Sequence, residues 1–286
     1  MRSAELVLYS LAKLLYRSEV AQSTEMKAAL ISDTAYAEHR NKELAKVTQA
    51  AARYAVPIKG TILDLGCNDG AITVGYLNYG ADQVIGIDID SKAIERANQL
   101  RAANNASFYV GTIDSIPMAD SSVDTIFSYD VFEHVSDVPG LLREIRRVLR
   151  PGGKALIGTW GWKNPFAPHL WSTMPVPWAH CFVSEPTLLR ACRRVYRSSW
   201  YQPNMHDLRE DGTLKDKYNE DHIPREYLNK YLIRDFERAF SASGMTWEIH
   251  ASTFGKTPFL KPLLAIPRLR EYLTAYFWAV LMRTDH

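Results

Sequence analysis

The sequence predicts an α/β fold in which helices cover a mainly parallel sheet, and residues 62–88 carry most of that prediction. An apolar run at 62–65 breaks into a turn that contains Gly66 and Gly70, a helical stretch follows, and a second apolar run ends in Asp88. This order describes a β-α-β unit that is built to hold a nucleoside. Glycine lets the backbone take positive φ and pass close to a ligand. Asp88 ends the second strand, where its carboxylate can accept hydrogen bonds from both ribose hydroxyls.

Two classes of cofactor fit this unit. A dinucleotide requires the pattern Gly-x-Gly-x-x-Gly/Ala, because the second glycine lets the pyrophosphate lie against bare backbone at the helix N-terminus. The corresponding positions in this chain are Gly66, Asn68 and Ala71. Asn68 puts a side chain where the phosphates would lie, and Asp69 adds a negative charge beside it. This turn therefore disfavours a pyrophosphate and suits a cofactor with a cationic sulfonium and an amino group.

The spacing Asp64-x-Gly66-x-Asn68-x-Gly70 resembles motif I of the class I S-adenosylmethionine (SAM) methyltransferases, in which the middle position is usually glycine. A helix that Ser91 would cap follows the second strand. The later segments also follow the order of that family: strands at 107–112 and 123–128, a turn at 116–118, the segment 130–135, and a helix-turn-strand passage at 148–157. Pro151 would stop the helix of that last passage. The ordered matches make the resemblance specific for fold and cofactor.

The resemblance implies a Rossmann-like class I methyltransferase sheet of seven strands, with the last strand antiparallel and helices on both faces. The remaining strands are expected at 245–250 and 274–282, and further helices at 185–196 and 227–243. We expect an N-terminal helical lid over residues 1–57 and a methyltransferase domain over 58–286. Within that domain, substrate-side insertions are expected at about 161–183, 204–225 and 255–272.

The resemblance also implies the cofactor, SAM, with S-adenosylhomocysteine (SAH) as the product. Arg40 is expected to reach the SAM carboxylate and Tyr36 to cover the sulfonium, unless these residues form an ordinary surface helix. Relatives often have an acid that accepts the adenine amino group; at that position this chain has Thr112, so Asp114 or the backbone around Ile113 is expected to take the role. The expected cofactor-binding residues are Tyr36, Arg40, Asp64, Gly66, Cys67, Asn68, Gly70, Asp88, Ile89, Thr112, Ile113, Asp114 and Tyr129.

Composition narrows the classes of partner. A chain of 286 residues that is 47% hydrophobic can bury a substantial core, and its net charge of +2 gives no strong attraction to nucleic acid. Methylation of nucleic-acid bases is also disfavoured, because residues 128–131 read Ser-Tyr-Asp-Val where that chemistry uses Asn/Asp-Pro-Pro-Tyr/Phe. The three cysteines lack metal-ligand spacing, so we predict no metal site and a reducing, cytoplasmic location. The oligomeric state is left open.

The N-terminal segment shows no secretory signal, because Glu5 and Lys13 interrupt its apolar residues. No apolar run approaches the roughly 20 residues that span a bilayer. The helix expected over residues 6–17 either packs on the protein or lies on a membrane surface. Peripheral membrane contact therefore stays open.

Methyl transfer from a sulfonium is an in-line displacement, and a hydroxyl acceptor must also lose its proton to a base. A histidine with a near-neutral pKa suits that role. The candidate catalytic residues are His134, His169 and His180. His134 could instead line the cofactor site, and His169 or His180 could instead bond a loop carbonyl.

The segment 161–183 is rich in aromatic residues, prolines and histidines, which predicts a rigid loop at the carboxyl edge of the sheet. Its indoles suit stacking on a sugar ring or a planar aromatic. The expected substrate-binding residues are Trp160, Trp162, Trp171 and Trp178. We therefore expect O-methylation of a small-molecule hydroxyl, on a sugar, a glycan precursor or a natural-product phenol. The alternatives are methylation of N or C of a small molecule, and a non-catalytic module that binds SAM or regulates a partner.

Overall fold

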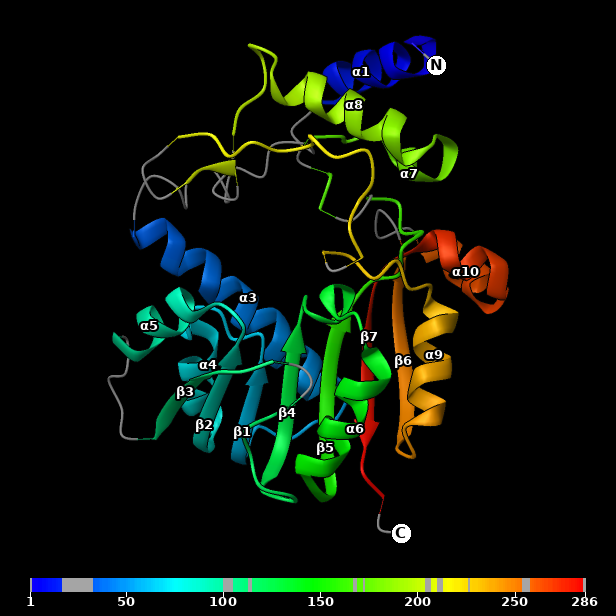
Figure 1. The fold of residues 1–286 in the computed structure, drawn as a ribbon. Coiled ribbons are helices and arrows are strands. Elements are labelled where there is room, and N and C mark those ends of the chain that lie inside the picture. Colours follow the sequence, from blue (N-terminus) through cyan, green and yellow to red (C-terminus); the bar gives the residue numbers. More distant parts are fainter. Residues whose placement is uncertain are drawn as a thin grey trace. The chain divides into compact units, whose positions relative to one another are not determined.

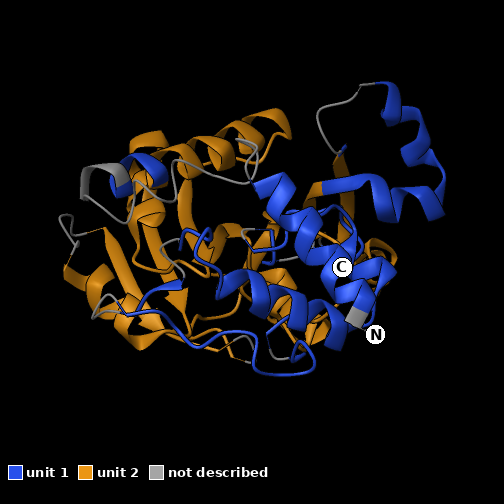
Figure 2. Cartoon of the chain, turned by 90° about the horizontal axis from the view of Figure 1, so that it is seen from above, with its two compact units in different colours: residues 1–39, 162–228, 253–275 blue, residues 40–161, 229–252, 276–286 orange. Residues whose placement is uncertain are grey.

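The structure is a computed structural model that describes residues 2–16, 33–99, 105–112, 115–166, 169–171, 173–203, 207–209, 213–225, 227–253 and 258–284. The chain divides into two compact units, which Figure 2 colours separately. Unit 1 comprises residues 1–39, 162–228 and 253–275, and unit 2 comprises residues 40–161, 229–252 and 276–286. Among the described helices, none is both long enough and apolar enough to cross a membrane.

The predicted sheet of seven strands is confirmed (Figure 1). Its strands are β1 (Gly60–Leu65), β2 (Ala81–Asp88), β3 (Ala106–Val110), β4 (Val123–Tyr129), β5 (Leu149–Thr159), β6 (Thr246–Thr253) and β7 (Thr274–Met282). Their order in the sheet is β3-β2-β1-β4-β5-β7-β6. Strands β1 to β5 pair in parallel, and β7 runs antiparallel to β5.

Helices cover both faces of the sheet, so both faces are buried. Successive strand residues point to opposite faces, so each strand contributes to both cores. Ile62 and Phe127 join a core with the helices α3 (Asp33–Arg53), α4 (Ala71–Gly75) and α5 (Ser91–Gln99). Their neighbours Leu63 and Ile126 join a second core with α6 (Val138–Val148) and α9 (Ile233–Ala242). The 3-10 helices η2 (Tyr76–Tyr79) and η3 (Phe132–His134) complete these layers. Parallel strands buried on both faces leave their loop-bearing carboxyl edge to bind ligands.

Three predicted helix ends differ from the structure, each because of a specific hydrogen bond. Asp90, not Ser91, caps α5, because its carboxylate accepts the backbone N–H of Lys92 at 2.9 Å. Helix α6 ends at Val148, before Pro151, since the carbonyl of Val148 accepts the N–H of Ser122 (2.9 Å) at the entry to β4.

Helix α9 begins at Ile233, six residues after the predicted start at Tyr227. The segment before Ile233 is not helical. Its residue Asn229 is held against η3, because the side-chain amide donates to the carbonyls of Phe132 and Val135 at 2.7 and 2.9 Å. The Asp235 carboxylate then accepts the N–H of Leu232 at 2.9 Å, which satisfies a donor that the first turn of a helix leaves free.

Unit 1 contains α1 (Arg2–Tyr16), α7 (Ala179–Phe182), α8 (Glu185–Tyr196), η6 (Pro258–Ala265) and α10 (Pro267–Leu273). Helix α1 packs on α8 and buries Leu8, Ala12 and Tyr16, which lie on one face at four-residue spacing. The phenol of Tyr16 donates to the carbonyl of Gln202 at 3.0 Å. Leu14 on the same helix stays exposed. The lid role of residues 1–57 and the substrate role of the insertions stay predictions.

Candidate functional site

The turn between β1 and α4 takes its shape from three residues with positive φ. Gly66, Asn68 and Gly70 have φ of 79°, 50° and 77°. A side chain at Gly66 would collide with Val131, and one at Gly70 would collide with the ring of Phe108. Asn68 also has positive φ, and asparagine is one of the few residues with a side chain that tolerate this conformation. The departure from the usual glycine at position 68 is therefore compatible with the same turn.

Asp88 closes the turn from the end of β2. Its Oδ2 accepts the N–H of Asn68 at 2.8 Å, and its Oδ1 accepts the N–H of Asp90 at 2.9 Å. Each carboxylate oxygen has two acceptor positions, so both can still receive a hydroxyl. Next to it the side chain of Ile89 is 76% exposed, and Thr112 at the end of β3 is exposed as well. The other two residues expected near the adenine, Ile113 and Asp114, lie outside the described residues.

A charged cluster lies behind the turn. Asp64 is buried and accepts the hydroxyl of Thr73, and burial raises its pKa to about 6. Arg40 of α3 forms an ion pair with Asp69 at 3.5 Å and with Glu43 at 2.7 Å. Helix α3 thus brings a guanidinium to the turn, next to the Asp69 carboxylate, the group expected to disfavour a pyrophosphate. Tyr36 lies on the same helix but belongs to unit 1.

Two buried carboxyl groups follow β4, and sequence reasoning missed them as site residues. Asp130, with φ of 56°, is held by its N–H, which donates to Gly158 at 2.9 Å. Glu133 accepts the hydroxyl of Thr159 at 2.7 Å. Glu133 Oε1 is buried, and no described residue hydrogen-bonds it. The carboxyl group of Asp130 is also buried, and the phenols of Tyr276 and Tyr129 interact with it. Burial raises the pKa of both groups, and for Glu133 the charge of Asp130 raises it further.

The only sequence signal for this pair was its position after a strand, because burial is a property of the fold. His134 follows Glu133 on η3 and is half-buried, and Trp160 is half-buried at the end of β5. Tyr129 ends β4, and burial raises the pKa of its phenol, which therefore stays a neutral donor. These residues belong to unit 2 together with the turn.

His180 is the most constrained of the three candidate bases. It lies in α7 of unit 1 and is 8% exposed. Its Nε2 lies 2.7 Å from the carbonyl oxygen of Trp162, so Nε2 carries the proton and donates. Nδ1 is then the basic nitrogen, and it is buried with no hydrogen-bond partner among the described residues. Burial lowers the pKa of His180, which keeps the ring neutral.

The remaining loop residues also lie in unit 1. His169 is exposed, and its ring centroid is 5.9 Å from that of Tyr227. Trp178 donates from Nε1 to the carbonyl of Tyr272 at 2.9 Å, and Trp171 packs edge-on against Phe166 at 4.8 Å. The expected cofactor residues other than Tyr36, Ile113 and Asp114 thus belong to unit 2, whereas His169, His180 and three of the four tryptophans belong to unit 1.

Residues 63–157 match the family model that is described as a methyltransferase domain. This match covers the turn, Asp88 and the buried acids, in a chain whose sheet has the strand order given above. Over these residues the chain carries a methyltransferase domain, and its sheet has the strand order of the class I SAM-dependent methyltransferases. The chain is 28% identical over 234 residues to a rice (Oryza sativa subsp. japonica) protein named "Probable tocopherol O-methyltransferase, chloroplastic". The aligned region covers 78% of this chain and 59% of the relative. This chain spans less than two thirds of the length of the first curated relatives that it matches.

Solved structures resemble this chain at the level of fold. A chain from the complex of the Haloferax volcanii Trm112 methyltransferase activator with a methyltransferase has a TM-score of 0.55 at 16% identity, covering 87% of this chain and 94% of that one. The geranyl diphosphate C-methyltransferase of Streptomyces coelicolor A3(2) has a TM-score of 0.51 at 14% identity, covering 85% and 77%. At these identities the likeness concerns the fold alone.

Proposed function

We propose that this chain is an enzyme that transfers the methyl group of SAM to a hydroxyl of a small molecule, a sugar, glycan precursor or phenol. The observation that carries the proposal is the turn after β1, where Asp88 keeps an acceptor position on each oxygen beside a glycine-lined backbone. The charges fit SAM as well. Asp64, Asp69 and Asp88 favour a ligand with a sulfonium and an amino group over a pyrophosphate.

In this proposal the residues of the turn bind and orient the cofactor. Asp88 accepts the ribose hydroxyls, Ile89 packs on the adenine, and Thr112 contributes at the same edge. Arg40 receives the cofactor carboxylate, and a cationic amino group near Asp64 would lower the raised pKa of that acid. SAM supplies an electrophilic methyl group, so catalysis depends mainly on alignment.

The protein itself supplies the base. His180 is our first candidate, because its neutral ring, fixed tautomer and free Nδ1 suit removal of a hydroxyl proton. His169 is the second candidate, and His134 the third. Trp160, Trp162, Trp171 and Trp178 are proposed to hold the acceptor. The rice relative, a probable tocopherol O-methyltransferase, supports the choice of oxygen as the acceptor atom. The geranyl diphosphate C-methyltransferase of Streptomyces coelicolor A3(2), which shares the fold, keeps carbon as the alternative. A cytoplasmic location and the absence of a nucleic-acid partner belong to the same proposal.

The test is a panel of sugars, phenols and polyketide hydroxyls, incubated with methyl-labelled SAM and the full chain and analysed by mass spectrometry. With an acceptor in hand, we expect His180→Ala or His169→Ala to lower turnover by at least about a hundredfold while SAM affinity stays normal. His222→Ala is the matched control, because His222 is exposed and plays no part in the proposal. Normal turnover in both variants would refute the assignment of the base. SAM binding without any methylated product would favour the non-catalytic module.

A further inference from the structure

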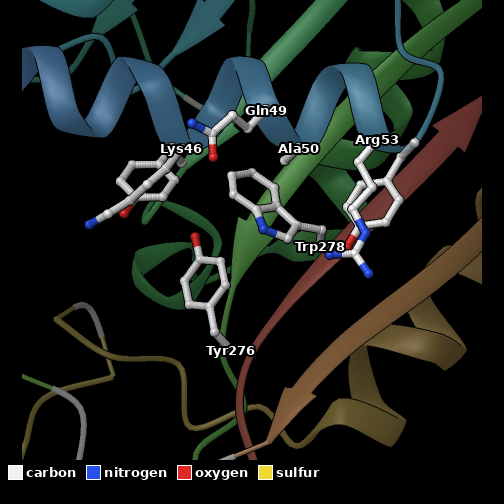
Figure 3. A pocket seen from close by; sticks show the side chains of 8 residues that line it. Lys46, Gln49, Ala50, Arg53, Tyr276 and Trp278 are labelled. Carbon is white, nitrogen blue, oxygen red and sulfur yellow. The ribbon is translucent and has the colours of Figure 1, made fainter. Parts of the chain in front are cut away.

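A pocket of about 490 Å³ lies in unit 2 between α3, the end of β4 and the start of β7 (Figure 3). This volume is in the range of small-molecule sites. Its residues were not among those expected to bind substrate, apart from Tyr129, which was expected to bind the cofactor. All of them belong to unit 2, so the pocket needs no residue of the aromatic loop.

Three aromatic rings form one wall. Tyr276 and Trp278 point to the same face of β7, since they are two residues apart, and Tyr129 joins them from β4. The ring centroids of Trp278 lie 5.8 Å from Tyr129 and 5.5 Å from Tyr276. Gly158 of β5 pairs with Trp278, and a Cβ at Gly158 would collide with the Trp278 indole. The bare glycine therefore makes the space into which both β7 rings fold.

Helix α3 forms the opposite wall with polar residues where a packed helix would have apolar ones. Lys46, Gln49 and Arg53 follow helical spacing, and all three are exposed. In the described part of the chain, neither Lys46 nor Arg53 has a carboxylate within salt-bridge distance, although Arg53 lies 5.7 Å over the ring of Tyr54. Figure 3 shows the Gln49 amide and the Trp278 indole facing the same space.

The acids around the pocket do not neutralise these two cations. Glu43 is engaged by Arg40 at 2.7 Å. Asp130 is buried, and burial raises its pKa to about 7; the charge of Lys46 opposes this rise only in part, and the two groups form no salt bridge. The Tyr276 hydroxyl is also buried, and it interacts with the Asp130 carboxyl group. The pocket thus combines one flat aromatic wall with an opposite wall that carries two cations, Lys46 and Arg53, neither of which has a salt-bridge partner among the described residues.

This combination selects one class of ligand. A methylated ammonium would suit the rings alone but is repelled by Lys46 and Arg53. A simple inorganic anion would leave the rings uncovered. We propose that the pocket binds a planar aromatic acid, with its ring on Trp278 and Tyr276 and its acid group toward Lys46 and Arg53. The proposal goes beyond the proposed function, because none of the pocket residues is assigned there to the acceptor or the base.

The test is calorimetry of the full chain with 2-naphthoate as the probe, with and without SAH. Two analogues separate the contribution of the ring from that of the charge. 2-Naphthamide keeps the planar ring without the charge, and cyclohexanecarboxylate keeps the charge without the planar ring. We expect 2-naphthoate to bind with a Kd below about 1 mM and each analogue to bind at least about tenfold more weakly. The double variant Lys46→Gln/Arg53→Gln and the variant Trp278→Leu should each weaken 2-naphthoate by at least about tenfold.

Arg96→Gln is the matched control, because Arg96 is an exposed arginine on α5 of the same unit. Melting temperature and SAH affinity, measured on every variant, show whether the fold is kept. If Trp278→Leu is unstable, the double variant still tests the proposal, because it changes only exposed side chains. Equal binding of 2-naphthamide would overturn the assignment of the acid group. Failure of 2-naphthoate to bind, with SAH binding intact, would overturn the inference and leave the proposed function standing. Binding of 2-naphthoate without SAH binding would refute only the proposed function.

Discussion

Asn68 stands where related motifs have glycine, and its φ of 50° shows how the turn accommodates it. Asparagine enters this region at little cost, whereas Gly66 and Gly70 are held by contacts that leave no room for a Cβ. Asn68 thus keeps the backbone conformation of the cofactor turn and adds a side chain at the position where a pyrophosphate would lie. Single positions of this kind decide between two cofactor classes that share one fold.

Asp88 offers the most direct test of cofactor binding. We expect Asp88→Ala to weaken SAM binding by roughly tenfold to a hundredfold, because charge-assisted hydrogen bonds to two hydroxyls are lost. Calorimetric titration with SAM measures the effect. Asp82→Ala is the control, an exposed acid at the other end of the same strand. Equal affinities in wild type and Asp88→Ala would mean that the ribose binds elsewhere.

Asp64 makes stability depend on pH. Its pKa is raised from 3.8 to about 6 by burial, so the folded state holds its proton over a range in which the unfolded state has lost it. Stability therefore falls as pH rises from about 4 to 6, and the cost is fully present above pH 6, on the order of 2 to 3 kcal/mol. Asp64→Asn removes the charge and keeps an acceptor for Thr73.

We expect the unfolding free energy of Asp64→Asn to rise relative to wild type between pH 4 and pH 7, as measured by urea titration at several pH values. Asp82→Asn, at an exposed acid, should show no such trend. Parallel profiles for Asp64→Asn and wild type would show that Asp64 ionises at its ordinary pKa in the folded protein.

Helix α6 depends on a single side-chain cap. Asp137 accepts the N–H of Gly140 at 2.9 Å, and this bond is worth about 1 kcal/mol at a helix N-terminus. We expect Asp137→Ala to lower the melting temperature by roughly 2 °C, and Asp137→Asn to restore most of the loss. Arg143→Ala separates the cap from the exposed ion pair of Asp137 with Arg143 at 3.7 Å, which contributes little. A loss in Arg143→Ala as large as in Asp137→Ala would contradict the cap.

At the scale of the whole chain, cofactor preference should appear in thermal stability. SAH at about one hundred times its Kd stabilises the folded state by about 2.7 kcal/mol, which is roughly 5 °C for a chain of this size. NAD should give no shift, because Asn68 and Asp69 lie where its pyrophosphate would bind. Differential scanning fluorimetry with both ligands measures this, and the SAH shift should shrink in Asp88→Ala. A shift with NAD and none with SAH would reverse the cofactor assignment.

The sequence by itself determined the sheet and most of the cofactor turn. These features arise from contiguous segments, in which apolar runs, turn glycines and strand-ending acids such as Asp88 lie within about thirty residues of one another. The start of α5, the end of α6 and the start of α9 differed from the prediction. At α6 and α9 the reason is that the competing partners, the N–H of Ser122 and the carbonyls of Phe132 and Val135, come from other elements.

Only the tertiary structure decided which polar groups are buried and which distant residues share a pocket. Asp130 and Glu133 read as ordinary acids after a strand, and only packing by other elements removes them from water and raises their pKa. The aromatic pocket joins Lys46 of α3 to Trp278 of β7, more than two hundred residues apart in the chain. No local pattern contains such a contact, because desolvation and proximity are set by atoms that the sequence brings together only by folding.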